Sequence, residues 1–297
     1  MSRMERLQAV IQDYAWGDTD FIARLQGRTP SGAPEAELWM GAHPRAASRI
    51  DGTGAPLDEV IAADPLGTLG PVVAANFGEL PFLAKVLAAA APLSIQSHPS
   101  VEQARRGFAR ETTAGVPLDA PHRTYRDRNH KPELICALTP FVAKCGFRDL
   151  DATLELFAEL GGAGLAELRG RLGAGGAASE VLADTLAWLL RLDAEAAGAL
   201  VDSTVAAAVG LSEGPYAADA GWTAELATLY PGDIGVTVAL LLHHVVLDPG
   251  EAMFLGAGNV HAYLRGAGIE LMATSDNVSR GGLTPKHIDV EELLAVA

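Results

Sequence analysis

The chain has 297 residues, of which 49% are hydrophobic, enough to build one large domain or two ordinary ones around a sizeable core. Its 22 Lys and Arg residues and 37 Asp and Glu residues give a net charge of −15, which excludes nucleic acid and anionic membrane surfaces as natural partners. An anionic substrate would therefore need a locally basic pocket in this acidic protein.

The compartment is indicated by the cysteines and by the apolar runs. Cys136 and Cys145 belong to no CxxC pattern, which favours a reduced chain over a disulfide. The start of the chain (MSRMERLQAVIQDYAWG) has neither the apolar stretch nor the cleavage site of a secretory signal. The most apolar run, Val238–Leu247, is far shorter than the ~20 residues of a membrane helix. We expect a cytoplasmic protein with no membrane partner.

The first 149 residues are rich in turn formers and short apolar runs. The runs Leu38–Met40 and Leu134–Leu138 predict strands, and the segment from Pro81 to Pro99 predicts two more, separated by an alanine-rich link and Pro92. Residues 101–128 carry many charges and turn formers, which predicts a short helix followed by an exposed loop.

The pattern changes after Asp149. Residues 150–231 show apolar positions at helical spacing, separated by glycine-rich breaks. From Gly232 the pattern returns to β, with the run VTVALLLHHVVL and then a turn at Asp248-Pro249-Gly250. We predict a mainly β protein with an α insert: residues 1–149 and 232–297 form one discontinuous domain, and residues 150–231 form an inserted helical subdomain.

A candidate metal site begins in the stretch PLSIQSHP. In a strand, Ser94, Gln96 and His98 point to the same face. Glu133 is the first residue of a predicted strand, and His261 follows a glycine-rich turn. Two imidazoles, a carboxylate and an amide oxygen suit a borderline divalent ion. The alternatives are an amphipathic strand with one face in water and histidines packed for structural reasons, as we expect for His43, His122, His243, His244 and His287.

Five motifs in order carry a family resemblance. YAWG, PLSIQSHP, HKPE, PGEAMFLGAGNVHAYL and IELMATSDNVSRGGLTPKHIDV resemble the type I mannose-6-phosphate isomerases. The resemblance implies a cupin-type, jelly-roll-like β-barrel with an inserted helical domain and one Zn²⁺ per chain. Members of that family usually continue after TPKHIDV into a second β-domain, so the resemblance implies that this domain is missing and that a β edge is exposed.

The resemblance also implies roles for individual residues. Mannose 6-phosphate and fructose 6-phosphate would be interconverted through a cis-enediol, with Arg280 stabilising the developing charge or ordering the substrate. The identity of the catalytic base stays open among Lys131, Asp276 and Glu270. His130 would assist opening of the sugar ring. By family position the zinc ligands are Gln96, His98, Glu133 and His261, the catalytic residues are Arg280, Lys131, Glu270, Asp276 and His130, and the substrate-binding residues are Ser94, Lys286 and Trp16.

Other interpretations stay open from the sequence. Two histidines and a carboxylate also form the triad of Fe(II)-dependent cupin oxygenases, although Gln96 would take a position that oxygen chemistry needs. A non-catalytic sugar-phosphate-binding cupin is the third reading. Lys286 is alternatively a solvated lysine, and Glu270 a strand carboxylate paired with Arg265. The expected partner is a small sugar phosphate, and the expected state is a monomer, with a weak homodimer as the alternative.

Overall fold

The computed structural model describes residues 4–297, and its centre is a ten-stranded antiparallel sheet organised around one long strand. This strand, β11 (His261–Ala273), pairs with different neighbours along its two halves. Its first half, His261–Arg265, pairs with β6 (Ile95–Ser97) and β8 (Phe141–Phe147). Its second half, Gly266–Ala273, pairs with β5 (Phe82–Ala89) and β7 (Glu133–Ala137). One strand therefore holds two parts of the sheet together.

The remaining strands extend these two parts. The main path runs β10–β7–β11–β5–β3–β2, while β12 pairs with β6 and β9 pairs with β8. A small separate sheet is formed by β1 (Leu7–Gln8) and β4 (Arg49–Ile50). Hydrogen-bonded pairs among residues 4–297 do not close into a ring, so the barrel stays a prediction. The outer strands are β2 (Val10–Gln12), β3 (Glu37–Gly41), β9 (Leu242–Leu247), β10 (Ala252–Leu255) and β12 (Ser279–Gly282).

A bulge in β11 makes the change of partner possible. The pairing register of β11 with β8 shifts between Tyr263 and Arg265, and Gly266 follows with a φ of 122°. A Cβ atom at this glycine would lie 2.6 Å from the Pro140 carbonyl oxygen, so the close approach requires glycine. The extra residue inverts the alternation of the strand. As a result Tyr263 and Glu270, seven residues apart, face the same interior and share a hydrogen bond.

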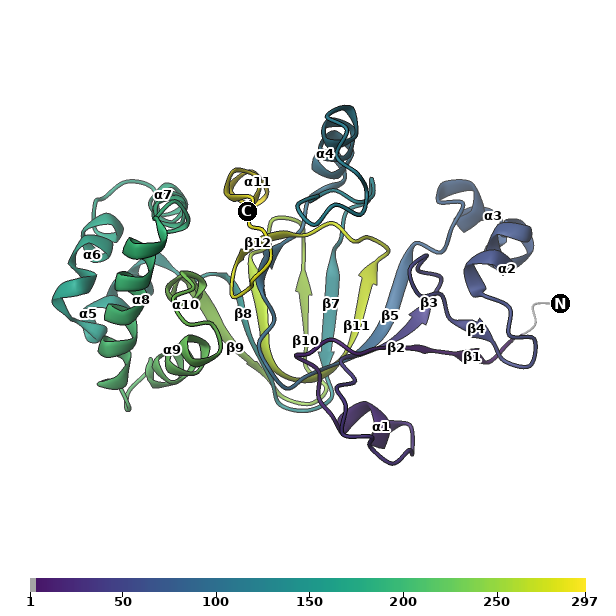
Figure 1. Ribbon diagram of the computed structural model, residues 1–297, viewed down its shortest axis with the longest axis horizontal. Coiled ribbons are helices and arrows are strands. Elements are labelled where there is room, and N and C mark those ends of the chain that lie inside the picture. Colours follow the sequence, from purple (N-terminus) through teal and green to yellow (C-terminus); the bar gives the residue numbers. More distant parts are fainter. Residues whose placement is uncertain (1–3) are drawn as a thin grey trace.

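Helices lie around the sheet in separate groups (Figure 1). In the group between β8 and β9, at the left of the figure, all helices except α10 fall within the stretch predicted to be helical. The apolar stripes of this group join residues of the sheet, such as Ala262 and Leu264, in one continuous core. The helices of this group are α5 (Leu150–Leu160), α6 (Ala166–Leu172), α7 (Ala178–Leu190), α8 (Ala194–Val209), α9 (Ala217–Leu229) and α10 (Gly235–Val238), with a 3-10 turn at Ala163–Leu165.

The other helices cover the remaining sides of the sheet. In Figure 1, α1 lies below the sheet, α2 and α3 lie beyond β3, and α4 and α11 lie above it. Leu293 of α11 is fully buried and packs over Gly281 of β12, where an added Cβ atom would lie 2.9 Å from the Leu293 side chain and 3.3 Å from that of Ile95. These helices are α1 (Phe21–Leu25), α2 (Leu57–Ala63), α3 (Pro65–Asn76), α4 (Val101–Thr113) and α11 (Val290–Val296).

A buried ion cluster ties the helical group to the sheet. Asp219 of α9 is 3% exposed and pairs with Lys144 of β8 and with Arg148, whose Nη2 lies 2.6 Å from the carboxylate. Burial acts to raise the pKa of Asp219, but the two cations outweigh it and lower that pKa. The charge of Asp219 therefore holds α9 against β8.

Two expectations about local structure were wrong. The run from Val236 to Leu247 was predicted to be a strand, but helix α10 and a 3-10 turn at Ala239–Leu241 precede β9, which begins only at Leu242. Residues 235–242 are all buried, so the run is apolar on every side and carries no periodicity that separates helix from strand.

The loop after α4 was predicted to be exposed, yet part of it is buried. Arg123, Thr124 and Tyr125 are each at most 9% exposed. The Glu111 carboxylate accepts hydrogen bonds from the backbone N–H groups of Thr124 (3.1 Å) and Tyr125 (2.8 Å), and the Asn277 side-chain oxygen accepts one from Arg126 N–H (2.7 Å). These bonds fold the loop inward, so basic side chains reach the interior.

Two smaller features agree with the composition. Both cysteines are free. Within residues 4–297 there is no helix with the length and apolar character needed to cross a membrane.

Candidate active site and metal centre

The largest group of predicted site residues lines a cavity of about 690 Å³. Seven Lys or Arg side chains and four carboxylates face it, so the cavity is locally basic within a chain of net charge −15. This is the electrostatic condition that an anionic substrate requires. The charged residues are Arg45, Lys85, Arg123, Arg126, Lys131, Arg280, Lys286, Glu37, Glu133, Glu270 and Asp276.

Three of the four predicted metal ligands meet at one buried point. His98 follows β6, Glu133 begins β7, and His261 begins β11, and their ligand atoms all lie within 4.8 Å of one another. Each of the three residues is at most 2% exposed. The alternative of a strand face in contact with water is therefore wrong for His98. The strand pairs β6–β11 and β11–β7 bring together residues that are far apart in the sequence.

The protonation of both imidazoles follows from their backbone contacts. His98 Nδ1 lies 2.8 Å from the Asn277 carbonyl oxygen, and His261 Nδ1 lies 3.0 Å from the Asn259 carbonyl oxygen. A carbonyl oxygen only accepts, so each Nδ1 carries the proton and donates. Burial, helped by the charge of Lys131, lowers the pKa of His98 to about 4, which keeps this ring neutral at pH 7.

The Nε2 atoms are then left with lone pairs that face a carboxylate. His98 Nε2 lies 3.3 Å from Glu133 Oε1, and His261 Nε2 lies 3.3 Å from Glu133 Oε2. Both Nε2 atoms and Glu133 Oε2 are buried and find no hydrogen-bond partner among the described residues. Lone pairs directed at a carboxylate repel each other unless a cation lies between them, so these residues fit a divalent metal ion with nitrogen and oxygen ligands.

Glu133 is ready to bind a cation because it is ionised. Burial alone would raise its pKa, but Lys131 Nζ, 2.9 Å from Glu133 Oε1, and the neighbouring His98 hold that pKa well below its usual range. Lys131 and Glu133 are two residues apart and therefore point the same way, into the cavity.

Gln96 and Arg280 both line the cavity beside this cluster. Gln96 lies opposite His261 in the β6–β11 pair and opposite Arg280 in the β6–β12 pair. Residues directly opposite in antiparallel strands carry their side chains on the same face. Burial, with a contribution from Arg126, lowers the pKa of Arg280, which still titrates far above neutrality and remains a cation.

Glu270 belongs to a network that the sequence analysis missed. The Lys85 ammonium lies 2.8 Å from Glu37 Oε1 and 2.6 Å from Glu270 Oε2. Tyr263 donates its hydroxyl hydrogen to Glu270 Oε1 at 2.8 Å. All four side chains are buried and line the cavity. The one signal in the sequence was a lysine in the middle of the apolar run FLAKVLAA.

The alternative pairing of Glu270 with Arg265 is wrong. Arg265 faces the outside, where it contacts the Glu225 carboxylate and lies over the Trp222 ring with its guanidinium carbon 4.9 Å from the ring centre. Arg265 and Glu270 are five positions apart and both follow the register shift, so alternation along β11 places them on opposite faces of the sheet.

A second set of charged residues lines the cavity at its more exposed end. Asp276 Oδ1 lies 3.0 Å from an Arg45 nitrogen and 3.7 Å from His43 Nε2. Lys286 is exposed to solvent as a residue, but partial desolvation of its ammonium in the cavity, together with the charges of Arg280 and Arg126, lowers its pKa. Asp276, Arg280 and Lys286 were predicted from the sequence. Arg45 and Arg126 were not, because their loops carry no pattern beyond scattered basic residues.

Of the other predicted residues, Ser94 and Trp16 line the cavity and His130 does not. The Trp16 ring stacks on Tyr14 with 5.7 Å between ring centres. His130 is exposed and lies outside the cavity. His130 belongs to the segment before β7, which begins only at Glu133, so its place in the motif does not fix the direction of its side chain.

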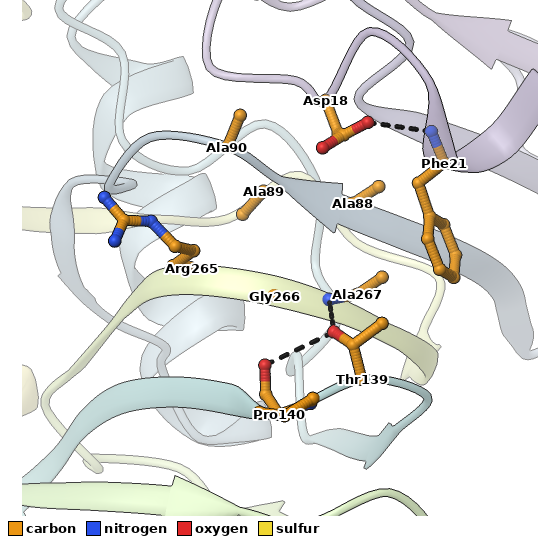
Figure 2. A pocket seen from close by; sticks show the side chains of 10 residues that line it. All are labelled: Asp18, Phe21, Ala88, Ala89, Ala90, Thr139, Pro140, Arg265, Gly266 and Ala267. Atoms are coloured by element: carbon orange, nitrogen blue, oxygen red, sulfur yellow. Dashed lines mark hydrogen bonds between the residues drawn. The ribbon is translucent and has the colours of Figure 1, made fainter.

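A second cavity, of about 390 Å³, contains none of the predicted site residues (Figure 2). Its floor is made of small residues of β5 and of the bend in β11. Asp18 Oδ1 accepts a hydrogen bond from Phe21 N–H at 2.7 Å, and Thr139 Oγ1 accepts one from Ala267 N–H at 2.9 Å (Figure 2). These polar atoms serve the protein itself, so the basic cavity remains the candidate site.

Comparison with known proteins agrees with this geometry. The sequence profile described as "Phosphomannose isomerase type I, catalytic domain" matches residues 4–150. A mannose-6-phosphate isomerase of Escherichia coli is 44% identical over 300 residues, which cover 98% of this chain and 74% of that protein. The chain belongs to the type I phosphomannose isomerase family. A more distant relative, the mannose-6-phosphate isomerase of Rattus norvegicus, is 37% identical over 320 residues, covering 98% of this chain and 72% of that protein.

Solved phosphomannose isomerases share the fold. A mannose 6-phosphate isomerase bound with zinc and yttrium is 42% identical, with a TM-score of 0.88, and the match covers 99% of this chain and 74% of that one. The apo form from Salmonella typhimurium is 43% identical, with a TM-score of 0.90, covering 100% of this chain and 74% of that one. The chain therefore spans about three quarters of the length of these phosphomannose isomerases.

Proposed function

We propose that this chain is a zinc-dependent isomerase that interconverts mannose 6-phosphate and fructose 6-phosphate through a cis-enediol. The observation that carries the proposal is the pair of imidazole lone pairs directed at the Glu133 carboxylate in a buried, basic cavity. Zn²⁺ held by His98, Glu133 and His261, with Gln96 as the fourth ligand, would act as a Lewis acid toward the substrate oxygens.

The remaining steps belong to the protein's own side chains. Lys286, Arg126 and Ser94 line the cavity and are suited to bind the phosphate group by charge and by hydrogen bonding. Arg280 lies opposite the proposed ligand Gln96 in the β12–β6 pair, where a permanent cation is suited to stabilise negative charge on the enediol oxygens. The Trp16 ring, stacked on Tyr14, forms an apolar part of the wall.

A proton must leave C2 of the open-chain aldose and arrive at C1. Lys131 and Glu270 are titratable groups that line the cavity. Lys131 lies 2.9 Å from the proposed ligand Glu133, and Glu270 is buried. Asp276 is held by Arg45 and is partly exposed. We therefore assign proton transfer to Lys131 and Glu270 and not to Asp276. His130 is left out of the catalytic set because it is exposed outside the cavity.

The proposal extends to architecture and setting. The two parts of the sheet that share β11 would form a cupin-type barrel, with the discontinuous domain 1–149 and 232–297 carrying the site and residues 150–231 serving as its helical insert. The expected partner is the sugar phosphate, in a cytoplasmic monomer.

The test is a coupled assay of mannose 6-phosphate isomerisation. Activity should disappear with a chelator and return with added Zn²⁺. Retained binding of the sugar phosphate without any turnover would favour a binding protein, and metal analysis that finds iron, together with oxygen consumption, would favour an oxygenase.

A further inference from the structure

We propose that Glu37 and Trp39 are positioning residues that hold the Lys85 ammonium at a fixed place in the cavity wall. The proposal rests on the proposed function, because it concerns how the same cavity is prepared for turnover. Glu37 Oε1 lies 2.8 Å from Lys85 Nζ, and Glu37 Oε2 accepts a hydrogen bond from Trp39 Nε1–H at 2.8 Å. The two oxygens of one carboxylate thus have separate partners.

Strand geometry makes this arrangement rigid. Trp39 lies opposite Lys85 in the β3–β5 pair, and Glu37 lies opposite Leu87, so Glu37 and Lys85 are diagonal neighbours on the same face. Glu37 and Trp39 are two residues apart on β3 and share that face. Their side chains are 5% exposed each, and Lys85 is 6% exposed, so the contacts are protected from water.

Glu37 prevents a simple pairing of Lys85 with Glu270. The ammonium lies between two carboxylates, at 2.8 Å from one and 2.6 Å from the other. Burial acts against the charged lysine, but the two carboxylates outweigh this and raise the pKa of Lys85. Without the charge of Glu37, the ammonium would be drawn to Glu270 alone, and Glu270 would lose its present balance between Lys85 and the Tyr263 hydroxyl.

Trp39 connects the buried contacts of Glu37 and Lys85 to the more exposed part of the cavity. Its ring packs edge-on against His43, with 4.9 Å between ring centres, and the Arg45 guanidinium carbon lies 5.9 Å from the ring centre. Arg45 in turn pairs with Asp276 at 3.0 Å. The indole therefore lies between the Lys85 network and the Arg45–Asp276 pair, and it fixes both.

The test is Glu37→Gln, which keeps the shape of the side chain and removes its charge. We expect kcat to fall about 10- to 100-fold while KM changes less than about twofold and zinc content stays at the wild-type level. Glu37→Asp, which restores the charge, should recover part of the lost kcat. Glu35→Gln is the matched control, because Glu35 is also buried on the same segment but pairs with Arg28 outside the cavity.

A second readout does not depend on activity. In metal-free protein labelled with ¹⁵N, the indole N–H resonance of Trp39 should move in Glu37→Gln and stay in place in Glu35→Gln. Trp39→Phe, which keeps all charges, should lower kcat by about threefold to tenfold. Wild-type kcat in Glu37→Gln, or an unchanged Trp39 resonance, would overturn the proposal. If the wild-type protein has no isomerase activity but the resonance moves, the proposed function fails while the hold on Lys85 stands.

Discussion

Arg280 lies directly opposite Gln96 in the antiparallel pair β12–β6, and Gln96 in turn lies opposite His261 in the pair β6–β11. Backbone pairing alone therefore aligns a cation, an amide and a proposed metal ligand on one face of three neighbouring strands. Residues from motifs that are far apart in the sequence are therefore neighbours at this point of the sheet.

Removal of Gln96 tests the fourth metal ligand. Gln96→Ala should lower zinc affinity at least about tenfold and reduce activity in parallel, since even outer-shell partners contribute that much to metal affinity. Zinc per chain after dialysis, measured by mass spectrometry, is the readout. Gln12→Ala on the outer strand β2 serves as the control. A Gln96→Ala protein with a full complement of zinc would remove Gln96 from the ligand set.

Removal of Arg280 tests charge stabilisation. Arg280→Ala should keep its zinc and lose about 100- to 1,000-fold in kcat, the range measured when one group that stabilises developing charge is deleted. Arg49→Ala, an exposed arginine on β4, should behave like the wild type. Turnover near the wild-type rate in Arg280→Ala would contradict the role, whatever happened to KM.

The Asp219 cluster predicts a pH-dependent stability. The pKa of Asp219 is lowered on folding, so its stabilisation is fully present above the ordinary aspartate value near 4 and is lost as pH falls through the lower folded value. Asp219→Asn should cost about 3–5 kcal/mol at pH 7, because two buried cations lose their partner, and the difference should shrink in acid.

Denaturant unfolding at pH 7 and at pH 3 checks this prediction, with the exposed Asp184→Asn as control. A penalty that is the same at both pH values would show that the stabilisation comes from packing and not from the carboxylate charge.

The packing of Leu293 leads us to expect that helix α11 stabilises the fold next to the site. The Leu293 side chain is fully buried and packs over Gly281, the residue after Arg280 in β12. Leu293→Ala should destabilise the protein by about 2–5 kcal/mol and lower Tm by several degrees. Leu66→Ala, at a leucine that is 65% exposed, should change stability by less than about 0.5 kcal/mol. Equal Tm values for the two variants would contradict the packing argument.

Local alternation accounts for most of what could be predicted from the sequence. The runs at Leu38 and Leu134 are strands β3 and β7, and the split at Pro92 separates β5 from β6. Helices α5 to α9 fall within residues 150–231, as the helical spacing predicts, but helices α1 to α3 in the first 149 residues were not predicted. Residues 235–241 are helical where a strand was predicted, because burial on every side removes any period.

The site was harder to predict wherever long-range pairing decides it. His98, Glu133 and His261 were identified because their residue types are rare in apolar runs and their motifs are distinctive. Lys85 and Glu37 were missed because only the register of β3 against β5 makes them partners. His130 was placed in the site by its motif, although it is exposed outside the cavity in the segment that precedes β7.

The bulge in β11 makes the chain length between His261 and Glu270 critical. Deleting one residue there would restore regular alternation, so that Glu270 would exchange sides with Ile269 and Leu271, which are now partly exposed on the outer surface. A carboxylate would then leave the interior and an apolar side chain would replace it beside Lys85. At outward-facing positions such as Ile269, this stretch of β11 should therefore tolerate substitution far better than insertion or deletion.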